Sequence, residues 1–162
     1  MITKIISGAQ SGADLAGLDV AKALRIKTGG WMSRGFETED GPRPDYAQTY
    51  GLRDLSSVRY PARTRRNVQD AHATLIFSGF ATLQGGTLLT YGICQEERKP
   101  VLVFYLPTTE WNLRLQMEVF DFLEGLSVLN VAGSRESQAP GTYQATYRML
   151  HAFLTHLRKW PA

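Results

Sequence analysis

The sequence has few of the features that mark a secreted, membrane-bound or metal-binding protein. Its 162 residues include one cysteine, Cys94, so no internal disulfide can form, and a reducing cytoplasm is the expected compartment. No uncharged apolar run approaches the roughly 18–20 residues of a membrane span, and residues 1–7 lead into a turn rather than a signal peptide. The histidines lack the spacing of a metal site. We therefore expect a soluble cytoplasmic protein without a metal site of its own or a membrane partner.

Common nucleotide-binding and hydrolase motifs are missing as well. Gly8 and Gly12 are four residues apart, which does not match G-x-G-x-x-G, and no acidic residue closes the second predicted strand at the ribose position. The chain contains neither G-x-x-x-x-G-K-[ST] nor a G-x-S-x-G elbow. These absences argue against a conventional NAD site, a P-loop ATPase and a serine hydrolase.

Strand-like apolar runs alternate with helical patterns along the chain. Strands are expected at residues 4–7, 25–31, 73–78, 100–105 and 127–132, and helices at 14–24, 64–71, 85–97, 110–124 and 143–157. Residues 32–60 carry glycines and prolines without a clean period, which predicts one long functional loop. The alternation predicts one domain over residues 1–162 of the α/β class, a Rossmann-like three-layer sandwich with a mostly parallel sheet.

Positive charge is concentrated in one part of the chain. The net charge is +3, and residues 25–66 hold nine Lys and Arg against five Asp and Glu. This excess indicates an anionic partner nearby, with a solvated basic face as the alternative. Arg63, Arg65 and Arg66 cluster beside Tyr60. A small-molecule anion suits so short a cluster better than a nucleic acid, whose sites interleave several aromatic residues with a longer basic groove.

Three predicted strands end in small, polar turns that contain glycine, at residues 7–14, 78–87 and 132–137. The carboxyl ends of parallel strands form the usual ligand crevice, and a helix N-terminus offers N–H groups to an anion. A structural role explains any one such turn, but three together predict a site for a phosphate-bearing ligand. The candidate phosphate-binding residues are Gly8, Gln10, Ser11, Gly12, Asp14, Gly79, Gly85, Gly86, Thr87, Thr90, Gly133, Arg135 and Glu136.

A second group of residues is expected to cover the ligand or neutralise its charge: Trp31, Glu39, Asp40, Arg63 and Arg66. The indole of Trp31 could stack on a heterocycle, with core packing as the alternative. Glu39 and Asp40 could fold over a ligand from the long loop, or form a solvated turn. Among the phosphate-binding candidates, Asp14 has the alternative role of a helix N-cap.

The motifs also resemble those of a known family. Residues 6–14 are similar to the first glycine loop of the putative molybdenum-cofactor carrier proteins, a branch of the SLOG (DprA/LOG-like) Rossmann superfamily. Further motifs follow in the family's order, at residues 28–31, 38–42, 63–64, 67–68, 85–87, 129–137 and 139–141. The resemblance implies a Rossmann-like fold, a homo-oligomer and a pocket for a phosphorylated heterocycle. That ligand would be the molybdenum cofactor (molybdopterin) or a nucleotide, with molybdoenzymes as acceptors.

The sequence departs from the family pattern at positions that bear on chemistry. Ala9, Ser11 and Leu15 stand where the family loop usually has glycine, threonine and arginine, so this loop lacks a cation. Thr90 stands where LOG-type phosphoribohydrolases carry a catalytic glutamate after their Gly-Thr, and its hydroxyl removes the usual general acid/base group. The resemblance therefore implies a binding or carrier protein rather than an enzyme.

Two other functions stay open from the sequence. A nucleotide N-glycosidic hydrolase of the LOG type would need Glu136, Asp14 or Glu39 to supply the missing carboxylate. A DprA-like binder of single-stranded nucleic acid would use Tyr60 and the arginines of 63–66, and its affinity would fall steeply with salt.

Overall fold

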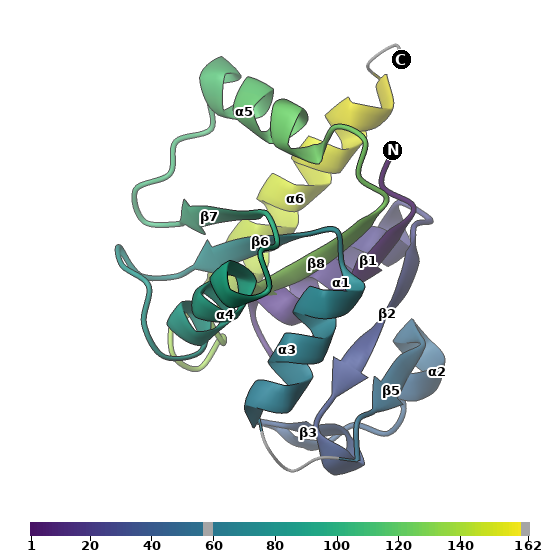
Figure 1. Cartoon of the computed structure of the whole chain (residues 1–162). Coiled ribbons are helices and arrows are strands. Elements are labelled where there is room, and N and C mark those ends of the chain that lie inside the picture. Colours follow the sequence, from purple (N-terminus) through teal and green to yellow (C-terminus); the bar gives the residue numbers. More distant parts are fainter. Residues whose placement is uncertain (57–59, 160–162) are drawn as a thin grey trace.

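A six-stranded parallel sheet organises the fold, in the order β5-β2-β1-β8-β6-β7 (Figure 1). The structure is a computed structural model that describes residues 1–56 and 60–159, without the side chains of Tyr60, Arg158 and Lys159. The strands of the sheet are β1 (Lys4–Ile6), β2 (Lys27–Met32), β5 (Leu52–Asp54), β6 (Ala73–Ser78), β7 (Val101–Tyr105) and β8 (Val128–Gly133). The helices are α1 (Ala13–Ala23), α2 (Tyr46–Tyr50), α3 (Tyr60–Asp70), α4 (Gly85–Glu96), α5 (Leu113–Leu123) and α6 (Thr142–Lys159).

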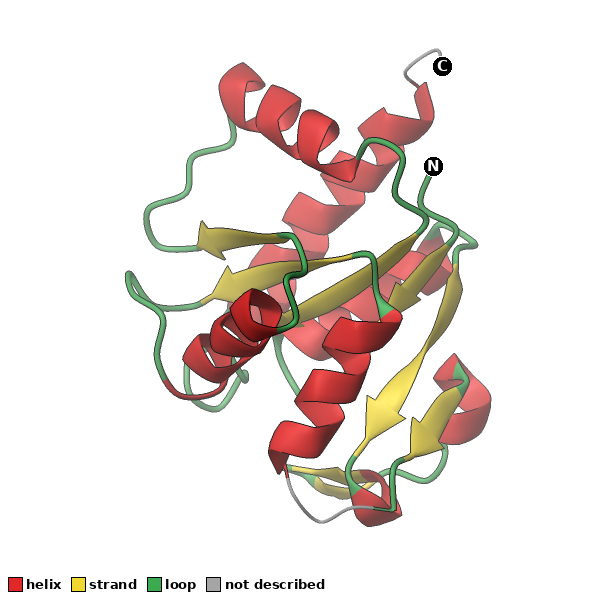
Figure 2. Ribbon diagram, viewed as in Figure 1, coloured by secondary structure: helices red, strands yellow, loops and turns green. Residues whose placement is uncertain are grey.

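Helices cover both faces of the sheet, as Figures 1 and 2 show. On one face α6 packs against α1 and α5, and on the other α3 packs against α4. Every residue of β6 is buried, because this strand has neighbours on both sides and helices above and below it. Leu75, Phe77 and Leu150 belong to the main core cluster between the sheet and α6. The predicted Rossmann-like α/β sandwich is confirmed.

The prediction of one long loop over residues 32–60 was wrong for the described part of this stretch. It contains a 3-10 turn (Arg34–Phe36), an antiparallel hairpin of β3 (Glu37–Thr38) and β4 (Gly41–Pro42), helix α2 and the edge strand β5. Tyr46, Tyr50 and Leu52 bury their side chains in a second core cluster. Elements of two to five residues are too short to produce a recognisable hydrophobic period, which is why the pattern did not reveal them.

The carboxyl ends of the strands meet at one edge of the sheet because all six run in the same direction. β1 leads through α1 to β2 on one side, whereas β6 leads through α4 to β7 on the other, and β8 lies between β1 and β6. The glycine turns after β1, β6 and β8 therefore become neighbours where the direction of winding reverses. Among the described residues, no helix is long and apolar enough to cross a membrane.

Candidate functional site

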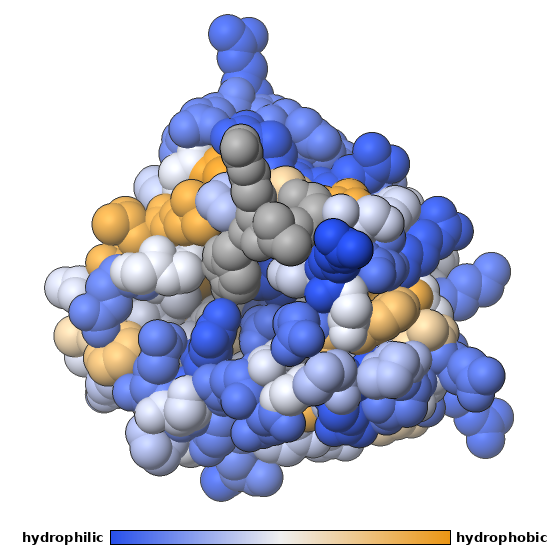
Figure 3. Space-filling model, turned by 90° about the horizontal axis from the view of Figure 1, so that it is seen from below, coloured by the Kyte–Doolittle hydropathy of each residue, from blue (hydrophilic) through white to orange (hydrophobic). Residues whose placement is uncertain are grey.

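A cleft of about 540 Å³ opens between the N-terminus of α4 and the turn that follows β8. It is lined by Phe80, Gln84, Gly85, Gly86, Thr87, Gly133, Ser134, Arg135 and Gln138. The volume lies within the roughly 300–1,000 Å³ typical of small-molecule sites. Seen from below, the end toward which β2 and β5 run, the surface is mostly hydrophilic (Figure 3). The cleft combines residues from two of the predicted glycine turns and suits a polar ligand.

The N-terminus of α4 presents backbone N–H groups to this cleft. The N–H groups of Thr87 and Leu88 donate to the carbonyl of Gln84, so those of Gly85 and Gly86 precede the first hydrogen bonds of the helix. Gly85 has a φ of +50°, and a Cβ there would have no heavy atom within 4 Å, so a side chain would project into open space. Exposed N–H groups at the positive end of a helix dipole favour an anion.

A buried pair of charges lies beneath the first glycine turn. The Arg63 guanidinium donates from Nη1 to the carbonyl oxygen of Gly8 at 2.8 Å, and the same nitrogen lies 3.6 Å from Oδ2 of Asp14. Burial raises the pKa of the Asp14 carboxyl above its ordinary value, although the Arg63 charge opposes the rise. A small cavity of about 20 Å³ joins this pair to Gly86 and Thr90. Arg63 therefore supports the floor of the site and holds the first turn in place.

The hairpin of β3 and β4 closes over the first turn through Glu39. The Glu39 carboxylate accepts hydrogen bonds from the hydroxyls of Ser11 and Ser137, and Ser11 Oγ also accepts from the N–H of Glu136 at 3.0 Å. Glu39 thus connects the hairpin to the turns after β1 and β8. Asp40 is exposed at the tip of the hairpin, where its N–H donates to Thr38 Oγ1 at 3.2 Å.

A second cavity of about 290 Å³ lies beside this hairpin. Its lining residues are Gln10, Ser33, Arg34, Glu37, Thr38, Glu39 and Arg135. Arg135 lines this cavity and the larger cleft, so the two are adjacent. A ligand longer than a phosphate group could therefore extend from α4 toward the hairpin.

Some predicted site residues have contacts that build the turns. Glu136 accepts from the N–H of Gly141 at 2.6 Å with Oε1 and from the N–H of Tyr143 at 2.8 Å with Oε2, which caps α6. The N–H of Gly79 donates to Ser134 Oγ at 3.0 Å. The N–H of Ala13, the residue after Gly12, donates to the Ser134 carbonyl at 3.2 Å. These residues fix the three turns relative to one another.

The side chains of the basic cluster at residues 63–66 point to different sides of α3, because successive residues of a helix face different directions. Arg63 is buried, Arg65 forms ion pairs with Glu96 at the end of α4 and with Glu97 just after it, and Arg66 pairs with Asp70 at 3.2 Å. The side chain of Tyr60, which the nucleic-acid hypothesis needs, lies outside the described residues. The three arginines do not form the single cationic face that the sequence suggested.

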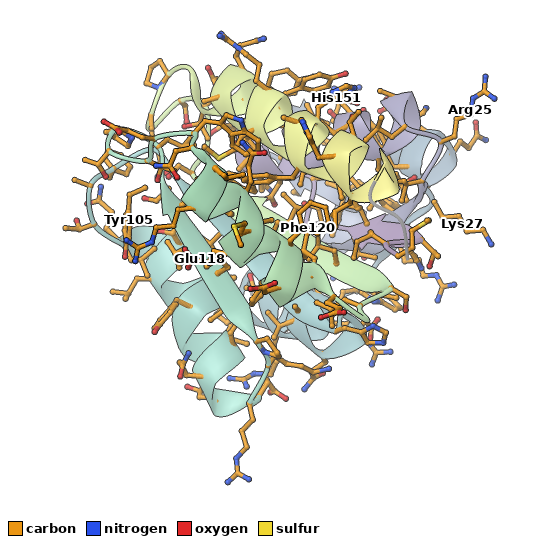
Figure 4. All side chains as sticks on the ribbon, turned by 90° about the horizontal axis from the view of Figure 1, so that it is seen from above. Arg25, Lys27, Tyr105, Glu118, Phe120 and His151 are labelled. Carbon is orange, nitrogen blue, oxygen red and sulfur yellow. The ribbon has the colours of Figure 1, made fainter. Side chains whose placement is uncertain are left out.

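Trp31 lies against α3 among charged side chains. Its Nε1 donates to Asp70 Oδ2 at 2.7 Å, and the guanidinium carbons of Arg66 and Arg53 lie 5.1 and 5.6 Å from the ring centroid. The structure thus assigns Trp31 and Arg66 to the flank of α3, and neither lines the cleft beside α4. Arg25 and Lys27, also in the basic segment, project outward near the start of β2 (Figure 4), away from the carboxyl ends of the strands.

Sequence reasoning missed several residues of the site. Phe80, Gln84 and Gln138 line the larger cleft, and Asn67 and Asn130 line the small cavity beneath it. Asn130 had a usable signal, since it is a polar residue inside an apolar strand and is 2% exposed. Asn67 belongs to the family motif at 67–68, which was not read as part of the site, and Phe80, Gln84 and Gln138 lie in or beside the glycine turns. Among the described residues, no cluster of three His, Cys, Asp or Glu side chains could hold a metal ion.

Comparison with known proteins gives two matches that extend over most of the chain. The profile of the circularly permutated YpsA SLOG family matches residues 5–154. The 1.45 Å crystal structure of a protein from Syntrophus aciditrophicus SB, named "Putative molybdenum carrier protein", is 37% identical and superposes with a TM-score of 0.82. The match covers 94% of this chain and 95% of that one. A search of curated proteins gave no match.

Proposed function

The chain belongs to the circularly permutated YpsA SLOG family, and from this premise we propose that it binds and carries a phosphorylated heterocycle. The SLOG resemblance read from the motifs is confirmed. The ligand would be a pterin phosphate, as in the molybdenum cofactor, or a nucleotide. The Syntrophus protein is named as a molybdenum carrier, and the resemblance of the motifs to molybdenum-cofactor carriers adds the pterin. The wider resemblance to the SLOG superfamily supports the nucleotide. Molybdoenzyme acceptors and self-association stay predictions from that resemblance.

One observation carries this proposal: the N-terminus of α4 and Arg135 face the same cleft at the carboxyl ends of β6 and β8. The N–H groups of Gly85 and Gly86 would hold the phosphate oxygens, and the guanidinium of Arg135 would balance their charge. No carboxylate is among the residues that line this cleft. Both features favour a doubly charged anion over a neutral ligand.

The residues around the phosphate position favour binding over hydrolysis. Thr90 Oγ1 donates to the carbonyl of Gly86 at 2.9 Å, so its hydroxyl is directed to the backbone of its own helix. All three candidate carboxylates have structural partners. Glu136 caps α6, Glu39 accepts from two serines, and Asp14 lies 3.6 Å from Arg63 Nη1. A carrier needs the anion site alone, without a general acid.

Native mass spectrometry of freshly purified protein, followed by denaturation and identification of released small molecules, tests the proposal. We expect a phosphorylated pterin or nucleotide to co-purify. Calorimetric titration with pairs of compounds that differ only in phosphate, such as guanosine and guanosine 5′-monophosphate, extends the test. The phosphorylated member should bind at least tenfold more tightly. Equal affinity within such pairs, or no binding by any of them, would contradict the proposal.

Asp14 supports a second candidate function, hydrolysis of a nucleotide N-glycosidic bond. Its carboxyl is buried, has a raised pKa and lines the small cavity with Gly86 and Thr90, which suits a general acid. Water would attack the ribose C1′ as the C1′–N bond breaks, a proton from Asp14 would pass to the departing base nitrogen, and the proton released by the water would return to Asp14. Release of free base from a panel of nucleoside monophosphates, lost in Asp14→Asn, would favour this function. A panel without turnover would exclude it.

A further inference from the structure

We infer that the cavity beside the β3–β4 hairpin binds the ring of the ligand, and that Gln10 selects rings with an N–H donor next to a carbonyl oxygen. Guanine and pterin share this edge. The inference rests on the proposed function, since it needs the phosphate to lie at α4. It adds a ring subsite, a residue that reads it and a preference among heterocycles.

Gln10 carries an unusual acceptor. Its side chain is held in place because Nε2 donates to the carbonyl of Glu37 at 3.0 Å, which also determines which end of the amide is oxygen. The residue is 5% exposed, and Oε1 is buried with no hydrogen-bond partner among the described residues. A buried acceptor without a donor is costly, and most such groups in proteins find one. Gln10 lines the cavity beside the hairpin, and a ligand N–H that displaces the atoms shielding Oε1 there would supply the missing donor.

The position of the cavity fits one ligand that spans two subsites. Gln10 and Arg135 line the cavity of about 290 Å³, and Arg135 also lines the cleft where α4 begins. Arg34 lines the cavity as well. Guanidinium groups donate hydrogen bonds and never accept them, whereas Gln10 Oε1 accepts. In the complex that we infer, Gln10 would supply the acceptor and the guanidinium groups the donors, which complements a ring edge that carries N–H and C=O together.

The contacts of Gln10 also bear on the choice between bases. Glutamine reads adenine by using its oxygen and its amide nitrogen together. Here one of the two Nε2 hydrogens donates to the Glu37 carbonyl, so a paired contact of the oxygen and the nitrogen with adenine would compete with that bond. A single acceptor beside guanidinium donors suits the guanine or pterin edge better. Glu39, hydrogen-bonded to Ser11 and Ser137, would keep the hairpin over the bound ring.

Calorimetric titration of the wild type and of Gln10→Leu with three probes tests the inference: guanosine 5′-monophosphate, adenosine 5′-monophosphate and ribose 5-phosphate. We expect the wild type to bind the guanine nucleotide at least tenfold more tightly than the other two. Gln10→Leu should remove that preference while its affinity for ribose 5-phosphate stays within twofold. Gln95→Leu is the matched control, because Gln95 is an exposed residue of α4 that lines neither the phosphate cleft nor the ring cavity, and it should keep the preference.

The outcomes separate the two proposals. If ribose 5-phosphate binds the wild type as tightly as the guanine nucleotide does, the ring subsite is wrong and the phosphate site stands. An unchanged guanine preference in a folded Gln10→Leu protein also overturns the role of Gln10. If none of the probes binds the wild type, the proposed function fails first. If Gln10→Leu does not fold, Gln10→Asn takes its place. This variant withdraws the amide by one methylene and should also lose the preference for the guanine nucleotide.

Discussion

Arg63 Nη1 lies 2.8 Å from the carbonyl oxygen of Gly8, and a Cβ at position 8 would lie 1.7 Å from the same nitrogen. The bond joins α3 to the first glycine turn across 55 positions of the sequence. It requires a glycine because the buried guanidinium occupies the space of a side chain. The geometry of the first turn therefore depends on a residue from a different part of the chain.

Gly8→Ala is expected to destabilise the protein by about 1–3 kcal/mol, because the added methyl group must displace a guanidinium that has little room to move. Urea unfolding measures the change. Gly92→Ala is the control, since a Cβ there meets nothing within 4 Å and Gly92 is inside α4. This control should gain about 0.5–1 kcal/mol from the better helix propensity of alanine. Equal effects at both positions would show that Arg63 does not restrict position 8.

Asp14 should make stability depend on pH in an unusual direction for a carboxylate. Its pKa is raised above the ordinary 3.8, so the folded protein holds this proton more tightly than the unfolded chain does. The contribution of Asp14 to the free energy of unfolding should therefore fall as pH rises through the interval between 3.8 and the raised value. Urea unfolding of the wild type and of Asp14→Asn across that range measures it. We expect the wild type to lose stability relative to the variant, and a constant difference would contradict this.

Glu39→Ala should loosen the β3–β4 hairpin. The variant loses the hydrogen bonds from Ser11 and Ser137, and bonds to a charged group contribute roughly 1.5–3 kcal/mol. Hydrogen exchange of the amides in residues 37–41 should accelerate by at least about tenfold. Asp40→Ala removes the same charge from the neighbouring exposed residue and should leave exchange unchanged. Similar acceleration in both variants would mean that charge, and not the contact with the serines, holds the hairpin.

Gly86→Leu should abolish binding of phosphorylated ligands while the protein stays folded. Gly86 lines the large cleft and the small cavity, so a leucine there would fill the position proposed for the phosphate. We expect the affinity for ribose 5-phosphate to fall by more than tenfold in a calorimetric titration. Gly92→Leu adds the same side chain to the same helix and should change the affinity by less than twofold. Retained affinity in folded Gly86→Leu would move the phosphate away from α4.

The sequence determined the elements with a clear local pattern. The apolar run of 73–78 became the buried strand β6, and the glycine pair at 85–86 became the start of α4, because both patterns depend on residues close in the chain. The glycine turns were also predicted to follow their strands, and the structure brings these turns to one edge of the sheet. Even the position of the cleft beside Gly85 and Gly86 follows from where a parallel sheet places its strand ends.

Only the tertiary structure decided which side chains meet at that edge. Arg63 is buried against Gly8 and Asp14, Glu136 caps α6, and Gln10 is held by the Glu37 carbonyl, and none of these contacts follows from a local pattern. The same holds for residues 32–56, whose short elements gain their stability from packing on α1 and β2. Local periodicity reports the element that a residue belongs to. The partner of a buried polar group depends on long-range packing, which brings together residues tens of positions apart.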